Sequence, residues 1–256
     1  MIPKIIHACW LGKAEMPQVY KDYVEGWKKL NPDFEVKLWT DEDFEKYYDD
    51  SLFVKDCLRL KKYGFLADFF RFTVLYEFGG VYIDTDVEMF KPLDEFMNYK
   101  MFMCYIFDSS IGTATIGTEA HNPLIKEWLE KLEKDYDEKK NFTVSNDWIT
   151  KYFIDNFEDF RLSGKHQSLK CGIELFPKEY FERYHGNKKK PGGWAEHHCA
   201  GSWSDSKDGK MKKILKKILP RRLISYLGHK KFIKTTPYYE IYKKQRKEIK
   251  WKWISM

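Results

Sequence analysis

The sequence predicts an α/β domain in which helices cover a mainly parallel sheet. Short apolar runs of β-type composition alternate along the chain with stretches of helical periodicity, which is typical of layered α/β domains. The length of 256 residues and the hydrophobic fraction of 43% suit one large domain with a modest appendage. The sequence shows no internal repeat and no long low-complexity linker.

The first third of the chain is expected to contain two strands and a series of helices. In order, we expect a buried strand at 3–10, a helix at 18–30, a strand at 34–39 and helical segments at 41–78. The first helix should stop near Asn31, because the residue before a proline disfavours helical geometry. Alternating polar and apolar side chains indicate the second strand. Gly64 is expected to interrupt the helical segments.

The middle of the chain returns to strands after a glycine pair at 79–80. The later elements are expected to be strands at 101–107 and 114–117, helices at 121–140 and 145–157, and a strand at 173–176. Ligands gather at the carboxyl ends of strands in sheets of this kind. Trp10 ends the first strand and Asp84 and Asp86 end a later one, so we expect these side chains to line one cleft.

Asp84 and Asp86 are the strongest candidates for a metal site. They are two residues apart, so on an extended backbone both carboxylates would point to the same face. Two hard oxygen ligands suit Mg2+ or Mn2+ and leave coordination positions open for the phosphates of a substrate. Such a site would bind a nucleotide-sugar diphosphate and assist its departure.

The Asp-x-Asp spacing alone is a weak signal, because it occurs three times. Chance predicts about 1.4 such triplets for 19 Asp in 256 residues. The triplet at 41–43 follows a threonine typical of a helix N-cap, where acidic residues are favourable. The triplet at 135–137 lies in alternating charges typical of a solvated helix face. Only the triplet at 84–86 follows an apolar β-type run, which favours it as the metal site.

A second candidate region is the stretch 192–203, which follows a basic loop at 186–191. It holds a pair of histidines, a serine and a tryptophan close to glycines. These side chains could reach a metal or a diphosphate from a loop. The alternative is a surface turn with one hydrogen-bonded histidine, and the residues alone leave both interpretations open.

Composition excludes several classes of protein. No apolar run approaches the ~20 residues that a transmembrane helix needs, and residues 1–7 are too short and too soon polar for a signal peptide. The five cysteines are odd in number and scattered, without Cys-x-x-Cys spacing. This pattern argues against a disulfide framework or a zinc site, so we expect a cytoplasmic protein.

The net charge of +6 is unevenly distributed. Residues 205–256 contain 17 Lys and Arg against 4 Asp and Glu, so the rest of the chain is acidic overall. Apolar pairs recur every four residues at 211–219 with lysines between them, which indicates a basic amphipathic helix. We therefore divide the chain into a catalytic domain at 1–204 and a basic amphipathic helical extension at 205–256. The extension would either lie on the anionic inner face of the plasma membrane or pack on the domain.

Four segments together resemble the glycosyltransferases whose sugar-binding region contains a DXD motif; they are 2–10, 67–71, 79–86 and 197–203. That family includes initiating α-1,6-mannosyltransferases and bacterial capsular and exopolysaccharide enzymes, and it is distantly similar to clostridial glucosylating toxins. The resemblance implies a GT-A fold, with a single Rossmann-like mixed sheet flanked by helices. It also implies a nucleotide-sugar donor, a divalent cation (usually Mn2+, or Mg2+) and retention of anomeric configuration.

The resemblance also assigns roles to individual residues. Trp10 would stack on the nucleobase, and Asp68 and Arg71, which share a helix face, would hydrogen-bond hydroxyls of the donor sugar. Asp86 would ligate the metal directly, and His198 or a neighbour would complete the metal site. The predicted catalytic residues are Asp68, Arg71, Asp84 and Asp86; the predicted donor contacts are Trp10, Asp68, Arg71, Tyr82, Asp84, Ser202 and Trp203; the predicted metal ligands are Asp84, Asp86 and His198.

We expect a hexosyltransferase whose first candidate donor is a UDP-hexose and whose second is GDP-mannose. The acceptor is expected to be a glycan or a lipid-linked molecule, in capsule or exopolysaccharide synthesis. Asn146 and Asp147 are candidates to face the acceptor. A metal-dependent phosphohydrolase of nucleotide sugars is the first alternative, although it would not need the pair Asp68 and Arg71. A nucleic-acid-binding protein would explain the basic tail but not the acidic body, so no nucleic-acid partner is expected.

Overall fold

The computed structural model describes residues 1–47, 50–182, 193–199, 228, 231 and 233–254. The strands are β1 (Ile5–Cys9), β2 (Glu35–Trp39), β3 (Gly80–Ile83), β4 (Val87–Met89), β5 (Met101–Phe107), β6 (Ser110–Thr118), β7 (Gln167–Ser168), β8 (Ile173–Phe176) and β9 (Ala195–His197). The helices are α1 (Gln18–Leu30), α2 (Asp41–Phe44), α3 (Leu52–Arg59), α4 (Tyr63–Phe78), α5 (Pro123–Lys139), α6 (Ser145–Asn156) and α9 (Tyr239–Ile254), with a 3-10 turn at Asp94–Phe96.

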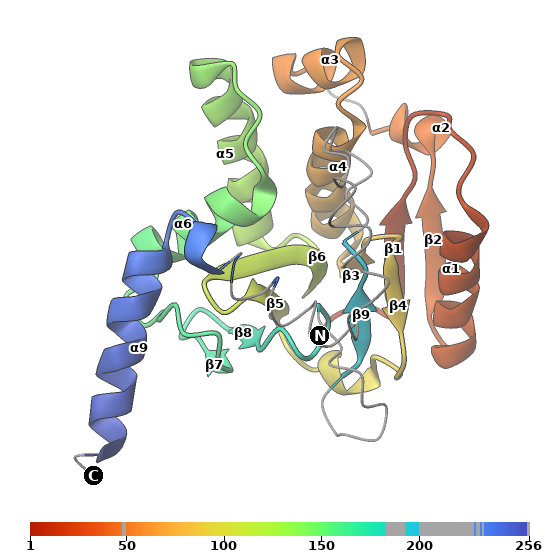
Figure 1. The fold of residues 1–256 in the computed structure, drawn as a ribbon. Helices are drawn as coiled ribbons and strands as arrows, with labels where there is room; N and C mark the ends of the chain where they lie inside the picture. The colour runs from red at the N-terminus through yellow and green to blue at the C-terminus, as the bar shows by residue number, and fades with distance from the viewer. Residues whose placement is uncertain (48–49, 183–192, 200–227, 229–230, 232, 255–256) are drawn as a thin grey trace, which may run out of the picture.

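The main sheet has seven strands in the order β2-β1-β3-β6-β5-β8-β7, and β4 and β9 form a small second sheet (Figure 1). The pairs β1–β2, β1–β3 and β5–β8 are parallel, whereas β3–β6, β5–β6 and β7–β8 are antiparallel. The expectation of a mainly parallel sheet is therefore wrong, because the β5–β6 hairpin reverses the chain beside β3. The α/β class and a single main mixed sheet flanked by helices are confirmed.

Most of the expected elements are present, and the structure adds several short or late ones that were not expected. The helix at 18–30 and the strands at 101–107 and 173–176 have the expected bounds. Gly64 does not interrupt a helix; it lies in the first turn of α4, and the break precedes it at Lys61, whose φ is 54°. The strands β4, β7 and β9 have only two or three residues, too few for a visible alternation, and α9 was not expected as a separate helix.

Two apolar cores lie on the two faces of the main sheet. Side chains of α3, α4, α5 and α6 form the larger core with one face, and α1, β4, β9 and the 3-10 turn form the other. In β3 the faces alternate as strand geometry requires: Tyr82 enters the larger core, whereas Val81 and Ile83 enter the other. The strand is buried throughout, so its end is a rigid support for the residues that follow.

The glycine pair before β3 is required by the backbone. Gly79 and Gly80 have φ of 64° and 90°, in the region that favours glycine. A Cβ on Gly79 would lie 2.5 Å from the Ala120 nitrogen, and one on Gly80 would lie 2.5 Å from the Ile5 oxygen. The chain can therefore turn from α4 directly into β3 only because neither residue has a side chain.

The described part of the C-terminal extension packs on the domain. Tyr242 of α9 is 3% exposed and belongs to the larger core. Tyr238 donates a hydrogen bond to the Asp147 carbonyl at 2.9 Å, and Gln245 accepts one from the Leu162 amide at 2.6 Å. The basic amphipathic stretch 211–227 lies outside the described residues, so its expected membrane contact stays a prediction. Among the described helices, none is long and apolar enough to cross a bilayer.

Candidate active site

The two aspartates of the DXD motif lie in a turn and not on an extended strand. β3 ends at Ile83, and the Val87 amide donates to the Asp84 carbonyl at 3.0 Å, which closes the turn before β4. The expectation that Asp84 and Asp86 lie on an extended strand is therefore wrong. The turn nevertheless brings both carboxylates together with the imidazole of His197, their ligand atoms lying within 4.8 Å of one another.

Arg71 of α4 connects the helix to the DXD turn. Its Nη1 lies 2.7 Å from Asp68 Oδ1 and donates to the Thr113 hydroxyl at 2.8 Å. Its Nη2 donates to Asp84 Oδ1 at 2.8 Å. Arg71 is only 4% exposed, so this contact holds Asp84 in one orientation through a buried, charge-assisted hydrogen bond. We call the set Asp68, Arg71 and Asp84 the arginine clamp.

Tyr82 lies beneath the arginine clamp and not in the open site. Its ring is 4.7 Å from the Arg71 guanidinium carbon, and its hydroxyl lies 3.1 Å from the Cys9 sulfur. It is 1% exposed, so the structure offers a donor molecule no face of this ring. Tyr82 therefore supports Arg71 through a cation–π contact instead of making the predicted contact with the donor.

The carboxylates of the arginine clamp are shifted in their acidity. Burial raises the pKa of Asp68 to about 6, although the Arg71 charge opposes the shift. Burial also raises the pKa of Asp84, again against the effect of Arg71. The Asp68 side chain keeps 13% of its surface exposed, so it can still accept hydrogen bonds from a ligand. Perturbed carboxylates grouped at a strand end are typical of functional sites.

The structure places His197, the neighbour of His198, in the predicted metal site. His197 Nε2 lies 3.3 Å from Asp86 Oδ1, and its Nδ1 lies 2.6 Å from Glu182 Oε2. Burial favours the neutral ring, but the carboxylate of Glu182, with Cys199 and Asp86, raises the pKa of His197 well above its usual value. Sequence reasoning missed Glu182, because nothing in its local sequence marks it.

His198 points elsewhere and ends a row of aromatic rings. Its Nε2 lies 3.1 Å from Glu88 Oε2, and its ring stacks on Tyr23 at 5.3 Å between centroids. Tyr23 follows Tyr20, which in turn lies 6.0 Å from Trp10. Trp10 is half-buried just after β1, beside the end of β3, so the predicted stacking surface for a base lies next to the DXD turn. Tyr20 and Tyr23 were not predicted as part of the site, because the sequence of α1 is that of an ordinary amphipathic helix.

The start of α6 is tied to the arginine clamp. The Thr113 hydroxyl, which accepts from Arg71, donates to Asn146 Oδ1 at 2.9 Å. Asn146 also accepts from the Thr113 amide at 2.9 Å. Asn146 therefore fixes α6 against β6, and its role toward an acceptor stays a prediction. Ser202 and Trp203 lie outside the described residues, so their predicted contacts with the diphosphate also stay predictions.

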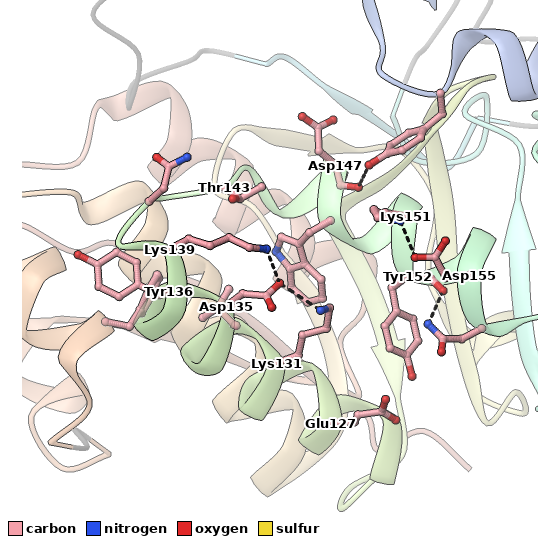
Figure 2. A pocket seen from close by; sticks show the side chains of 16 residues that line it. Glu127, Lys131, Asp135, Tyr136, Lys139, Thr143, Asp147, Lys151, Tyr152 and Asp155 are labelled. Carbon is pink, nitrogen blue, oxygen red and sulfur yellow. Dashed lines mark hydrogen bonds and ion pairs between the residues drawn. The ribbon is translucent and has the colours of Figure 1, made fainter.

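A cavity with a volume of about 380 Å³ lies between α5 and α6 (Figure 2). Lys131 and Lys139 both point to Asp135 across its wall, and Lys151 pairs with Asp155 (Figure 2). Asp147 lines it, as does Tyr152. The metal-site carboxylates do not line this cavity, so it is separate from the DXD turn.

The other two Asp-x-Asp triplets have the structural roles that the sequence indicates. Asp43 accepts a hydrogen bond from the Thr40 amide at 3.1 Å, as expected at the start of a helix. Asp135 pairs with lysines of α5, and Asp137 lies 3.5 Å from the Lys140 nitrogen. The lysines that pair with these triplets are exposed, whereas Arg71 is buried. Tertiary context therefore separates the three triplets as the sequence analysis proposed.

The residues at the DXD turn fit a divalent cation. Asp84, Asp86 and His197 offer two carboxylate oxygens and one imidazole nitrogen, a donor set that suits Mn2+. Their side chains are between 12% and 27% exposed, so the group opens toward solvent on one side. A second group that meets the same distance consists of Glu88 on β4, Glu196 on β9 and His198, which directly follows β9.

Residues 17–103 match the family described as "Glycosyltransferase sugar-binding region containing DXD motif". The matched stretch contains the whole arginine clamp and Asp86. The predicted resemblance to this family is therefore confirmed over residues 17–103.

Curated relatives carry related names. Inositol phosphoceramide mannosyltransferase 2 of Schizosaccharomyces pombe is 31% identical over 137 residues, which cover 52% of this chain and 39% of that protein. An uncharacterized glycosyltransferase of Acanthamoeba polyphaga mimivirus is 27% identical, covering 62% of this chain and 66% of that protein. The chain thus spans about two fifths of the length of the fungal relative. Among solved structures, the PaToxG glycosyltransferase has 17% identity and a TM-score of 0.46, covering 55% of this chain and 62% of that chain.

Proposed function

We propose that the chain is a retaining, metal-dependent hexosyltransferase that uses a nucleotide sugar. The observation that carries this proposal is the convergence of Asp84, Asp86 and His197 beside the arginine clamp. A phosphate-binding cation needs exposed oxygen ligands, and a sugar donor needs fixed polar groups beside it. Both requirements are met at the end of β3.

The residues of the chain would divide the work of binding and orientation. Trp10 would stack on the base, and the exposed edge of Asp68 would accept hydrogen bonds from hydroxyls of the donor sugar. Arg71 would keep Asp84 fixed, so that no reorientation is needed when the donor binds. A cation held by Asp84, Asp86 and His197 would supply positive charge that stabilises the departing diphosphate.

The transfer itself exchanges one bond for another. The bond between the anomeric carbon and the diphosphate oxygen breaks, and the acceptor hydroxyl oxygen bonds to the same face of that carbon. The acceptor proton passes to the departing diphosphate. This front-face course is consistent with retention and requires no nucleophilic side chain from the chain.

The names of the relatives support a hexose as the transferred group and a lipid-linked acceptor. Several are named as mannosyltransferases of inositol phosphoceramide, which makes GDP-mannose as reasonable a donor as a UDP-hexose. We propose a hydroxyl of a glycan or glycolipid as acceptor, with capsule or exopolysaccharide synthesis as the setting. A metal-dependent phosphohydrolase is the alternative, and the buried arginine clamp, which sugar-independent hydrolysis would not need, favours the transferase.

The test is nucleotide release from UDP-glucose, UDP-galactose and GDP-mannose with Mn2+, with and without simple glycoside and glycolipid acceptors. We expect release from one donor that an acceptor accelerates and that EDTA abolishes. Asp86→Ala should reduce the rate at least about 100-fold, because removing a group that stabilises transition-state charge has effects of this size. Asp137→Ala, in a solvated triplet, is the matched control and should retain full activity.

The outcomes separate the proposals. Release that ignores the sugar would favour the phosphohydrolase. Release that persists in EDTA would contradict the metal dependence. A product of inverted anomeric configuration would contradict the retaining course while leaving the transferase intact.

A further inference from the structure

Glu182 is a buried acid close to the candidate metal site that no step above uses. It is 1% exposed, although a carboxylate is among the groups most costly to bury. Its Oε2 lies 2.6 Å from His197 Nδ1. Among the described residues, its Oε1 has no hydrogen-bond partner. Packing alone would not require a carboxylate at this position, so the contact with His197 is the interaction that accounts for Glu182.

The backbone holds this pair in register. The Ala195 amide donates to the Tyr180 carbonyl at 3.0 Å, and the His197 amide donates to the Glu182 carbonyl at 3.2 Å. Residues 180–182 therefore pair with the edge of β9 that faces away from β4. The carboxylate and the imidazole are consequently neighbours by backbone pairing and not by chance contact of flexible side chains.

The surrounding fold leaves room for the carboxylate and for little else. A Cβ on Gly112 of β6 would lie 2.4 Å from Glu182 Oε1. The strand thus lacks a side chain at the position where the acid enters. Glu182, Gly112 and His197 therefore form one contiguous group that extends from β6 of the main sheet to the DXD turn.

The consequence concerns the two nitrogens of His197. A carboxylate at Nδ1 keeps the proton on that nitrogen, so Nε2, which faces Asp86, is the nitrogen that a bound cation would engage in place of a proton. Metal-binding histidines usually have such a partner, which fixes ring orientation and tautomer. Resting on the proposed function, we propose that Glu182 is the positioning residue that orients His197 Nε2 toward a divalent cation held with Asp84 and Asp86.

The test measures Mn2+ binding directly, by electron paramagnetic resonance titration of the full chain. We expect Glu182→Gln to raise the Kd for Mn2+ about 10–100-fold, the usual effect of removing such a partner. Glu174→Gln is the matched control, because Glu174 also pairs with a histidine, His166, at 2.7 Å but away from the DXD turn. This control should leave the Kd unchanged. Saturating Mn2+ should restore most of the kcat of Glu182→Gln, which a purely structural role would not allow.

Two results overturn the proposal. One is a folded Glu182→Gln variant, verified by circular dichroism, that binds Mn2+ as tightly as wild type. The other comes from the wild-type chain, should the variant fail to fold: long-range 15N NMR with Zn2+ bound must show the His197 proton on Nδ1, and a proton on Nε2 contradicts the proposal. Wild-type protein that binds no Mn2+ would instead overturn the metal dependence of the proposed function, so the two failures are distinguishable.

Discussion

At the scale of single residues, Arg71 is the most constrained side chain of the site. It is buried, it contacts two carboxylates and a hydroxyl, and the ring of Tyr82 lies beneath it. The sequence predicted Asp68 and Arg71 as partners from their spacing. It could not predict that Asp84 completes the contact, because that depends on how α4 and β3 meet.

We predict that Arg71→Met destabilises the fold by about 3–5 kcal/mol, because it leaves buried carboxylates without their cation. Activity should be lost at the same time, since Asp84 is no longer held. Urea unfolding checks the first effect and nucleotide release the second. Arg59→Met, which removes an exposed i,i+3 pair with Asp56, should change neither. Equal stabilities for Arg71→Met and wild type would contradict this assignment.

His7 gives the fold a pH-dependent component of stability. Its Nε2 donates to the Gly79 carbonyl at 2.8 Å, and its Nδ1 accepts from Trp39 at 3.1 Å, so both nitrogens are satisfied only in the neutral ring. Burial lowers the pKa of His7 to about 4. The unfolded chain, with a pKa near 6.5, therefore binds more protons than the folded one between these values.

We predict that the contribution of His7 is fully present above pH 6.5 and falls as the pH drops toward 4, by up to about 3 kcal/mol. The measurement is the free energy of unfolding in urea between pH 4.5 and 8, for wild type and His7→Gln. The stability difference between the two proteins should shrink as the pH falls. His166→Gln, at a half-exposed histidine, is the control. A difference that does not vary with pH would contradict the neutral, buried state of His7.

At the scale of elements, the site depends on the turn from α4 into β3 and the turn from β3 into β4. The first requires the two glycines, whose backbone angles and close contacts exclude side chains. The second gathers the carboxylates of Asp84 and Asp86 in a turn beyond the last residue of β3. The glycine pair was readable from the sequence, whereas the DXD turn was not, because two aspartates after an apolar run suit a strand equally well.

We predict that Gly80→Ala destabilises the fold by about 2 kcal/mol or more, from an unfavourable positive φ and contact with the Ile5 carbonyl. Because β3 leads into the DXD turn, activity should fall as well. Gly26→Ala in α1 is the opposite case, since no atom outside the neighbouring residues and the nearby backbone of the helix lies within 4 Å of the added Cβ. It should stabilise the fold by roughly 0.5–1 kcal/mol. Thermal unfolding of both variants is the measurement, and a Gly80→Ala variant as stable as wild type would contradict the proposed turn.

At the scale of the whole molecule, the basic extension is attached to an acidic body. α9 packs into the larger core through Tyr242, which supports the interpretation of a packed helix for that part of the extension. The boundary at 204/205 therefore does not separate two independent units at α9. The lysine-rich stretch at 211–227 lies outside the described residues, so its contact with a membrane stays a prediction.

We predict that the full chain sediments with vesicles containing anionic lipid and that 0.5 M salt releases it, because screening weakens each contact. Replacing four lysines of the stretch, Lys212, Lys213, Lys216 and Lys217, by glutamine should weaken binding on the order of 100-fold or more, since each is worth about 1 kcal/mol. The matched control replaces four exposed lysines of the body, Lys28, Lys29, Lys126 and Lys134. Equal loss in both variants would indicate nonspecific attraction and contradict the membrane role of the extension.

The sequence alone determined the α/β class and most long helices and strands, and it predicted Asp68, Arg71, Asp84 and Asp86 as site residues. The class and the elements follow from periodicity, glycine placement and local spacing, which are properties of neighbours along the chain, and the site residues follow from spacing together with the family resemblance. The tertiary structure decided that the imidazole of His197, and not that of His198, lies beside the Asp86 carboxylate, that Tyr82 is buried, and that Glu182 contacts His197. Each of these depends on which strands pair and in what register, and a shift of one residue changes the face to which a side chain points.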